Sequence, residues 1–198
     1  LTQNPKCNFI YTSYSQDLLT VISREIAGIL EHPIYKSMYR NSIAEIEVKE
    51  EDPVDEFWRQ YLYNSKDNKD KVNTYTSRKI VTSQGGVLLF SSIGSTITGF
   101  GAGIRGGKGF TGCLFIDDAN KPADIHSQTM RDKVVGYYVE TLLSRLNSSE
   151  IPIVNIQQRL HVEDLSGHLI AKYKFPTLVK PLIEPDGTLN LPSQYDNE

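Results

Sequence analysis

Two adjacent carboxylates, Asp117 and Asp118, carry the strongest chemical signal in this sequence. They follow a run of apolar residues, 112–116, whose near-continuous apolar character is typical of a strand buried on both faces. In parallel α/β sheets, ligands bind beyond the carboxyl ends of the strands. Paired carboxylates at that edge offer oxygen ligands for Mg²⁺, and one of them can orient or deprotonate an attacking water. The alternative is an ordinary strand that runs into an acidic turn, with Asp124 or Ser127 capping the next helix.

A second polar segment, 157–167, also follows an apolar run, 151–156, which we expect to be another buried strand. Because the carboxyl ends of parallel strands meet at one edge, Gln158 and Arg159 are expected in the same region as Asp117. An Arg there can stabilise charge on a transferring phosphate, and a Gln can position water. These two side chains are therefore candidate catalytic residues.

Two further residues of the same segment, His161 and Asp164, leave several roles open. They can cap and orient a short helix that we expect near 163–171. They can also serve as metal ligands, although two residues do not complete a site. A third alternative is a Mg²⁺-dependent nuclease site built on Asp117, Asp118 and Asp164.

The segment 94–109 contains seven glycines in sixteen residues. Its part 102–109 is similar to a phosphate-binding loop, but it lacks the first glycine and the final Ser or Thr, and it leads into a strand rather than a helix. We interpret it as a loop whose backbone approaches a ligand or a neighbouring strand, or as a flexible turn with positive φ angles. The candidate cofactor-binding residues are Gly99, Gly101, Gly103 and Arg105, the last as a contact for phosphate.

Composition places the chain among ordinary globular proteins. It has 198 residues, 21 Lys+Arg against 24 Asp+Glu and a net charge of −3, which suits one domain and excludes a uniformly basic DNA-coating protein. No apolar run approaches the roughly 20 residues that span a bilayer, and no secretory leader opens the chain. Two cysteines are too few for a disulfide framework or a zinc site. We therefore expect a cytoplasmic protein without a membrane partner.

Hydrophobic periodicity alternates between strand and helix along the chain. This alternation predicts an α/β domain with a mainly parallel sheet flanked by helices. The expected strands are 8–12, 78–82, 86–92, 112–116 and 151–156, and the expected helices are 18–30, 125–146 and 163–171.

The region 40–75 differs from the rest because it combines an acidic cluster, 45–56, with a polar turn, 64–71. Neither segment has an apolar face to bury, so we expect 40–75 to be an excursion on the surface. The stretch 66–79 is weakly basic and has tyrosines nearby, which offers a DNA contact or, as the safer interpretation, a solvated loop.

These elements, in this order, resemble the ATPase domain of the large terminase subunit, the DNA-packaging motor of tailed phages. The resemblance covers about residues 5–190 and includes the segments 98–103 and 114–118. Its most specific part is 158–167, since many relatives carry an Arg-aromatic-His-x-x-Asp-Leu-x-Gly version of it. The resemblance implies a partial P-loop NTPase domain with a RecA-like (ASCE) topology.

The resemblance also implies roles for individual residues. Asp117 falls at the Walker B aspartate that holds Mg²⁺, and Asp118 falls where many P-loop motors place a catalytic glutamate. The segment 157–161 corresponds to the part that couples ATP hydrolysis to DNA movement. The family's Walker A loop would lie upstream of residue 1 and its nuclease domain downstream, so 1–175 would be a partial ATPase domain and 176–198 a linker. ATP binding by this chain alone is then expected to be weak and its turnover negligible.

The resemblance finally implies a function and a set of partners. The intact protein would hydrolyse ATP with Mg²⁺ to package double-stranded DNA into the capsid, and would also cut that DNA. Its partners would be the portal, the small terminase subunit and further copies of itself, in the cytoplasm of a bacterial host. The alternatives are a non-catalytic prophage remnant that binds DNA or packaging subunits, and the Mg²⁺-dependent nuclease.

Overall fold

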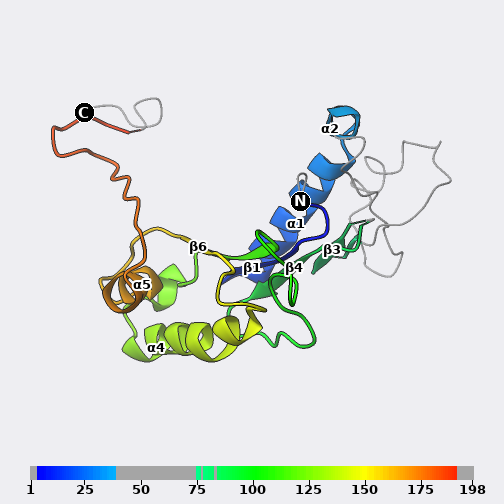
Figure 1. Cartoon of the computed structure of the whole chain (residues 1–198). Coiled ribbons are helices and arrows are strands. Elements are labelled where there is room, and N and C mark those ends of the chain that lie inside the picture. Colours follow the sequence, from blue (N-terminus) through cyan, green and yellow to red (C-terminus); the bar gives the residue numbers. More distant parts are fainter. Residues whose placement is uncertain (1–3, 39–74, 77, 83, 191–198) are drawn as a thin grey trace.

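The structure is a computed structural model that describes residues 4–38, 75–76, 78–82 and 84–190 (Figure 1). The predicted surface excursion, 40–75, lies outside the described residues except for its last position. The final eight residues of the predicted linker, 191–198, also lie outside them.

The described residues form one mixed sheet of six strands in the order β2-β3-β4-β1-β5-β6. The neighbours β4, β1, β5 and β6 pair in parallel, whereas β2 and β3 form an antiparallel edge beside β4. The predicted α/β fold with a mainly parallel sheet is therefore confirmed, while its assignment to the P-loop class stays a prediction. The strands are β1 (Asn8–Ser13), β2 (Tyr75–Thr76), β3 (Lys79–Val81), β4 (Val87–Ser92), β5 (Gly112–Asp117) and β6 (Ile153–Ile156).

Helix α1 (Gln16–Glu31) covers one face of the sheet. It begins where the Ser15 hydroxyl accepts a hydrogen bond from the Leu18 N–H, which satisfies one of the free donors of the first turn. Its buried residues pack with Phe9, Leu88 and Phe90 of β1 and β4. The helix ends next to Pro33, and the proline then opens a short second helix, α2 (Pro33–Met38), because its missing N–H is harmless at a first helical position.

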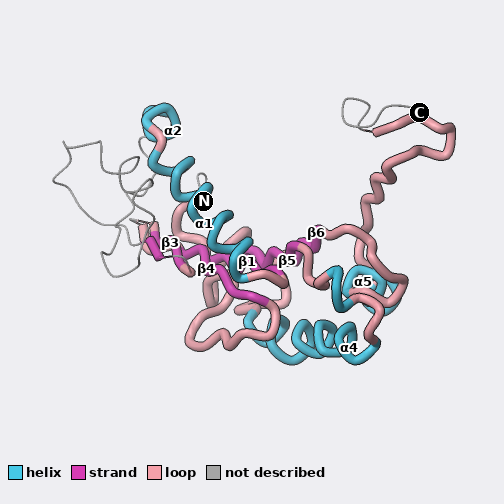
Figure 2. The backbone as a smooth tube through the Cα atoms, turned by 180° about the vertical axis from the view of Figure 1, so that it is seen from behind, coloured by secondary structure: helices cyan, strands magenta, loops and turns pink. Residues whose placement is uncertain are grey.

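The remaining helices cover the opposite face, as the two views from front and back show (Figures 1 and 2). Here Ile10, Leu114 and Ile116 are fully buried against Tyr138 and Leu165. The predicted helix 125–146 is broken into an α-helix, a π-helical turn and a 3-10 turn, and a separate 3-10 turn precedes it. These elements are η1 (Pro122–Asp124), α4 (Gln128–Tyr137), η2 (Tyr138–Leu142) and η3 (Leu143–Arg145), and α5 (Leu165–Tyr173) follows β6. None of the described helices has both the length and the apolar character needed to cross a membrane.

Strand β6 corrects one expectation. The segment 151–156 was predicted to be buried on both faces, but Val154 is 36% exposed and Ile156 is 60% exposed. Within the described part of the chain, β6 has a strand neighbour on one side only. Its register with β5 places both side chains on the face covered by α1, yet α1 packs mainly over β3, β4 and β1. The prediction of a buried strand is wrong because an apolar sequence does not reveal whether a strand lies at the edge of the sheet.

After α5 the chain leaves the body as an extended arm, residues 174–190, which projects away from the sheet (Figures 1 and 2). Lys174 ends the helix in the left-handed region with φ 56°. Phe175, at its start, packs against the core, whereas Leu178, Val179, Leu182 and Ile183 are exposed, and Leu178 reaches 86% exposure.

Candidate functional site

The paired carboxylates lie at the carboxyl edge of the sheet, as predicted. Asp117 is the last residue of β5 and pairs in register with Ser13 of β1 and Ile156 of β6. Its Oδ2 atom accepts a hydrogen bond of 2.5 Å from the Tyr11 hydroxyl, which comes from the neighbouring strand. Burial raises the pKa of Tyr11, and so do its hydrogen bond to Asp117 and the negative charges of Asp117 and Asp118. The phenol therefore stays protonated and holds one oxygen of Asp117 in place.

Asp118 occupies the turn that follows β5. Its φ of 44° lies in the left-handed region, which Asp tolerates better than most residues because its short side chain can bond locally. Its amide donates to the Ile156 carbonyl at 2.9 Å, and its carbonyl accepts from the Tyr14 amide at 3.1 Å. Its Oδ1 atom accepts a hydrogen bond of 3.4 Å from the Gln158 amide. The turn thus ties together the carboxyl ends of β1, β5 and β6.

The segment after β6 meets the acid pair, but its side chains differ in availability. Gln158 is exposed, and its backbone contact with Asp118 brings it to the predicted place. Arg159 is engaged elsewhere, because its Nε atom lies 3.1 Å from Asp164 Oδ1 and its Nη2 atom donates to the carbonyls of His161 and Val162. The guanidinium of Arg159 therefore closes the loop before α5, and its catalytic role stays a prediction.

Asp164 has a structural role that the sequence left open. The residue is fully buried, and its Oδ1 atom accepts a hydrogen bond from the Gly167 amide at 2.8 Å, so it is the N-cap of α5. Its Oδ2 atom also accepts from the amides of Leu160 and His161. These contacts occupy both oxygens of Asp164 and leave the nuclease alternative with two of its three carboxylates. Within the described residues, no three His, Cys, Asp or Glu side chains are grouped so that they could hold a metal ion.

The glycine-rich segment begins after β4 at the carboxyl edge, but its part around Gly103 lies at the opposite edge of the sheet. The Gly103 amide donates to the carbonyl of Asn8, the first residue of β1, whereas Asp117 aligns with Ser13, the last. Five residues of strand at about 3.3 Å each separate the two positions by roughly 16 Å. Arg105 also lies at this amino edge, where its Nε atom donates to Asn147 at 3.3 Å. The structure therefore places Gly103 and Arg105 away from the acid pair, and the binding role of the four candidate residues stays a prediction.

Local geometry explains three of the glycines without a ligand. Gly99 and Gly103 have φ angles of +66° and +80°, which matches the alternative of turns with positive φ. A Cβ atom at Gly101 would lie 2.7 Å from the Asn147 Oδ1 atom and 2.8 Å from the Arg145 carbonyl oxygen. At Gly101 the loop packs against the end of η3 and the residues just after it, and glycine is needed for that close approach.

Several buried polar atoms at the carboxyl edge have no hydrogen-bond partner within the described residues. They include the hydroxyl oxygens of Thr12 and Ser13 and both amide atoms of the Gln157 side chain. Native structures leave few such atoms unpaired, and an unpaired group often marks the place of a water, an ion or a ligand. Ser13 stands beside Asp117 in the sheet register, so one of these unpaired atoms lies next to the acid pair.

These donors suit a hard cation such as Mg²⁺, which prefers oxygen ligands. Among the described residues, Asp117 Oδ1 and Asp118 Oδ2 accept no hydrogen bond, and the hydroxyl oxygen of Ser13 is a further candidate ligand. A triphosphate finds less support, since Arg159 is bound within its own loop and Arg105 lies at the other edge. The residues present therefore fit the metal better than the nucleotide.

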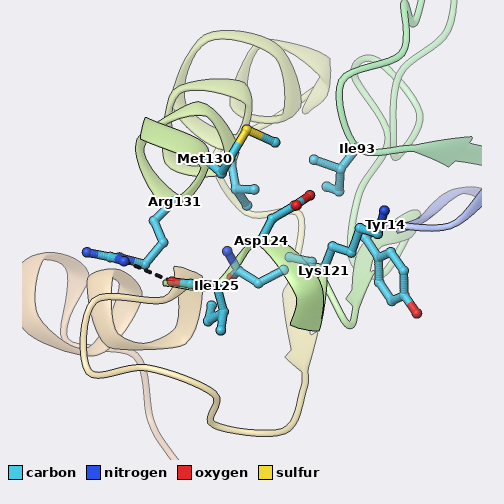
Figure 3. Close-up of a pocket in the computed structure, with 10 residues that line it drawn as sticks. Tyr14, Ile93, Lys121, Asp124, Ile125, Met130 and Arg131 are labelled. Atoms are coloured by element: carbon cyan, nitrogen blue, oxygen red, sulfur yellow. Dashed lines mark hydrogen bonds between the residues drawn. The ribbon is translucent and has the colours of Figure 1, made fainter. Parts of the chain in front are cut away.

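Two features of the site escaped sequence reasoning. The first is Tyr11, whose contact with Asp117 depends on the register between β1 and β5. The second is a cavity next to the acid pair, whose lining includes Tyr14, Lys121 and Asp124 (Figure 3).

No protein-family model, curated protein or solved structure matches this chain. The likeness to terminases therefore stays a prediction from the sequence motifs.

Proposed function

We propose that this chain is part of the ATPase domain of a phage large terminase subunit, and that the intact protein hydrolyses ATP with Mg²⁺ to package double-stranded DNA. One observation carries the proposal: the backbone N–H of Gln158 donates a hydrogen bond to Asp118 Oδ1, so the acid pair and the segment after β6 share one edge of a parallel sheet. The motifs of the resemblance require this proximity, and the carboxyl edge is where such sheets bind ligands.

The residues at this edge would have different roles in catalysis. Asp117, oriented by Tyr11, is the Mg²⁺ ligand, and Asp118 orients or deprotonates the attacking water. The exposed amide side chain of Gln158 is placed to position that water. When bound, Mg²⁺ supplies positive charge that offsets the charge developing on the phosphoryl oxygens.

The open side of β6 offers a place for the phosphate-binding loop that the resemblance puts upstream. Val154 and Ile156 lie on the same face of the sheet as α1, but α1 does not extend over β6, so both side chains are exposed. A further parallel strand beside β6 and a helix on that face would bury both side chains. A loop between that strand and that helix would begin at the carboxyl edge, next to Asp117.

Membership of the terminase family can be tested by translating the DNA immediately upstream of Leu1. The translation is searched, in frame and frame-shifted, for the phosphate-binding motif Gly-x-x-x-x-Gly-Lys-Ser/Thr. The protein extended to include that loop should hydrolyse ATP, and Asp117→Ala should lower kcat by at least about a hundredfold. Asp132→Ala is the matched control, because Asp132 is an exposed acid on α4. Absence of the motif, or equal rates for the two variants, would overturn the proposal. Hydrolysis at a motor-like rate by the present chain would contradict the account of the upstream loop.

The metal site can be tested on the present chain by Mn²⁺ titration with electron paramagnetic resonance. We expect saturable binding that is lost in Asp117→Asn and kept in Asp132→Asn, because only the first change removes a ligand at the carboxyl edge. Binding that survives Asp117→Asn would remove Asp117 from the site.

The arm favours a second candidate function, the docking of another packaging subunit such as the portal or the small terminase subunit. Leu178, Val179 and Ile183 are 86%, 69% and 57% exposed on a segment that leaves the body. Exposed apolar residues that are contiguous along the chain are typical of interaction sites. Salt-dependent DNA binding or subunit binding that is insensitive to nucleotide, and in the subunit case lost on Val179→Asp, would favour this function over the ATPase.

A further inference from the structure

The side chain of Asn120 links the turn of the acid pair to helix α5. Asn120 follows Asp118 by two positions and is 5% exposed. Its Oδ1 atom accepts a hydrogen bond of 2.9 Å from the backbone N–H of Leu165, the first residue of α5. The two residues lie 45 positions apart, and Leu165 is fully buried. This bond therefore joins two segments that are distant in the sequence.

The buried start of α5 requires such a partner. The first amides of a helix have no acceptor within the helix, and a buried amide without an acceptor is unfavourable. Asp164, the N-cap, accepts from the Gly167 amide, whereas the Leu165 amide donates to Asn120. One acceptor of this first turn is thus local, and the other comes from the turn after β5.

A longer hydrogen bond links the same two segments beside the acid pair. The sheet holds the chain as far as Ile156, whose carbonyl accepts from the Asp118 amide. Beyond it, the Gln158 amide donates to Asp118 Oδ1 at 3.4 Å, which exceeds the usual range of about 2.7–3.2 Å, and Gln158 is exposed. Such a bond restrains the loop weakly, so the position of Gln158 depends on the buried bond at the other end of the loop.

An ion pair from α4 contacts the loop as well. The Arg131 guanidinium donates to the Ile125 carbonyl at 2.8 Å (Figure 3) and to the Glu163 carboxylate at 2.9 Å. The Arg131 side chain is 8% exposed, but that of Glu163 is 66% exposed, and an ion pair open to water contributes little. The ion pair therefore restrains the loop less than the buried bond of Asn120 does.

We propose that Asn120 is a positioning residue, which holds the segment 158–165 against the acid pair so that Gln158 stays beside Asp118. This inference rests on the proposed function, in which Asp118 activates a water and Gln158 positions it, and it adds a residue for which the resemblance implies no role. Asn120 also orders the turn that carries the metal ligand Asp117. Losing an outer contact that orients a ligand typically weakens metal binding about 10- to 100-fold.

The backbone N–H of Gln158 provides a measurement that needs neither metal nor nucleotide. Its amide resonance reports the bond to Asp118, and Asp118→Gly gives the position of the free amide, because glycine accepts the φ of 44° at this site. Asn120→Ala should move the Gln158 resonance most of the way to that position. The matched control is Ser166→Ala, which removes the 2.6 Å bond between Ser166 and Asn155 in the same turn of α5 and should leave the Gln158 resonance unchanged.

Mn²⁺ titration of the same variants, followed by electron paramagnetic resonance, provides the second measurement. Asn120→Ala should bind Mn²⁺ about tenfold more weakly than wild type, while Ser166→Ala should bind it equally well. If Asn120→Ala does not fold, Asn120→Ser takes its place, because it shortens the side chain but keeps a polar group.

A Gln158 resonance that keeps its wild-type position in Asn120→Ala would overturn the proposal and leave Asn120 as a cap of α5 alone. An equal shift in Ser166→Ala, or wild-type Mn²⁺ affinity in Asn120→Ala, would also overturn it. If wild type itself binds no Mn²⁺, the proposed metal site is contradicted, and the amide resonance still decides the role of Asn120. Failure of this inference is thus distinguishable from failure of the proposed function.

Discussion

The hydroxyl of Tyr11 donates a hydrogen bond of 2.5 Å to Oδ2 of Asp117, and the two residues lie 106 positions apart in the sequence. The bond crosses from β1 to β5 on the face covered by α1, where Tyr11 also packs with the rings of Phe90 and Phe115. It holds one carboxylate oxygen and leaves Oδ1 available. The aromatic packing of the sheet thereby orients the acid at its edge.

Replacement of Tyr11 by Phe should remove this bond and keep the ring packing. We expect a loss of about 1–2 kcal/mol in the free energy of unfolding, since a hydrogen bond to a charged acceptor is lost. Urea denaturation of Tyr11→Phe and wild type measures the difference. Tyr14→Phe is the control, because the Tyr14 hydroxyl has no hydrogen bond within the described residues. A similar loss in both variants would show that the contact with Asp117 contributes nothing.

The same bond should make stability depend on pH in alkaline solution. The pKa of Tyr11 is raised in the folded state, by burial first and by Asp117 next, above the ordinary value of about 10. A group whose folded pKa is raised contributes its stabilisation below the unfolded pKa and loses it as the pH increases further. The unfolding free energy of wild type should therefore fall toward that of Tyr11→Phe above about pH 10. Parallel curves from pH 8 to pH 11 would contradict this account.

Asp164 should be one of the most sensitive polar positions of the domain. It is fully buried and accepts hydrogen bonds from three backbone amides while pairing with Arg159. Asp164→Asn would place an N–H group against these donors, so we expect a loss of about 3 kcal/mol or more. The midpoint of urea unfolding measures it, and Asp132→Asn on the exposed face of α4 should change it by less than about 0.5 kcal/mol.

Arg159 separates a structural role from a catalytic one. Its side chain is 44% exposed, so Arg159→Gln should cost only about 1 kcal/mol of unfolding free energy. In the extended, ATP-hydrolysing protein, a large fall in kcat together with such a small stability change would support the predicted catalytic role. An unchanged kcat would assign Arg159 to the loop alone.

Three glycines, Gly99, Gly103 and Gly136, should respond to substitution according to their surroundings. Gly103→Ala would place a Cβ atom 2.2 Å from Ile151 Cδ1 at a φ of +80°, so we expect a loss of at least about 2 kcal/mol. Gly99→Ala meets open space and should cost about 1 kcal/mol through its φ of +66°. Gly136→Ala, within α4 and free of contacts, should instead stabilise by about 0.5–1 kcal/mol. Thermal unfolding of the three variants checks this order, and an equal response would refute it.

A pair of isoleucines tests the edge position of β6. Ile116 of β5 is fully buried and Ile156 of β6 is 60% exposed. We expect Ile116→Ala to cost about 2–5 kcal/mol and Ile156→Ala less than about 1 kcal/mol. If the two substitutions cost the same in urea denaturation, β6 would be buried as the sequence predicted.

Much of the local structure could be predicted from the residues. The strands 86–92 and 112–116 and the short helix near 163–171 follow from side-chain chemistry within a few neighbouring positions. The proximity of Asp117 to the segment after β6 was also predicted, because parallel strands present their carboxyl ends at one edge.

The separation of Gly103 from the acid pair follows from its position shortly before the strand that Asp117 ends, because the two ends of one strand lie at opposite edges of the sheet. Glycine spacing by itself indicates only turns and close approaches. The Gly103 amide found its partner in the Asn8 carbonyl, at the start of β1, and this contact joins residues 95 positions apart.

The sequence by itself determined the elements, the α/β class and the adjacency of two acids at the end of a strand. These properties depend on periodicity, capping and residue type over short stretches of chain. Only the tertiary structure decided that β6 lies at the edge, that Tyr11 holds Asp117 and that a cavity opens beside Asp124. Each of these depends on strand order and register, which arise from packing between segments far apart in the chain and leave no local pattern in the sequence.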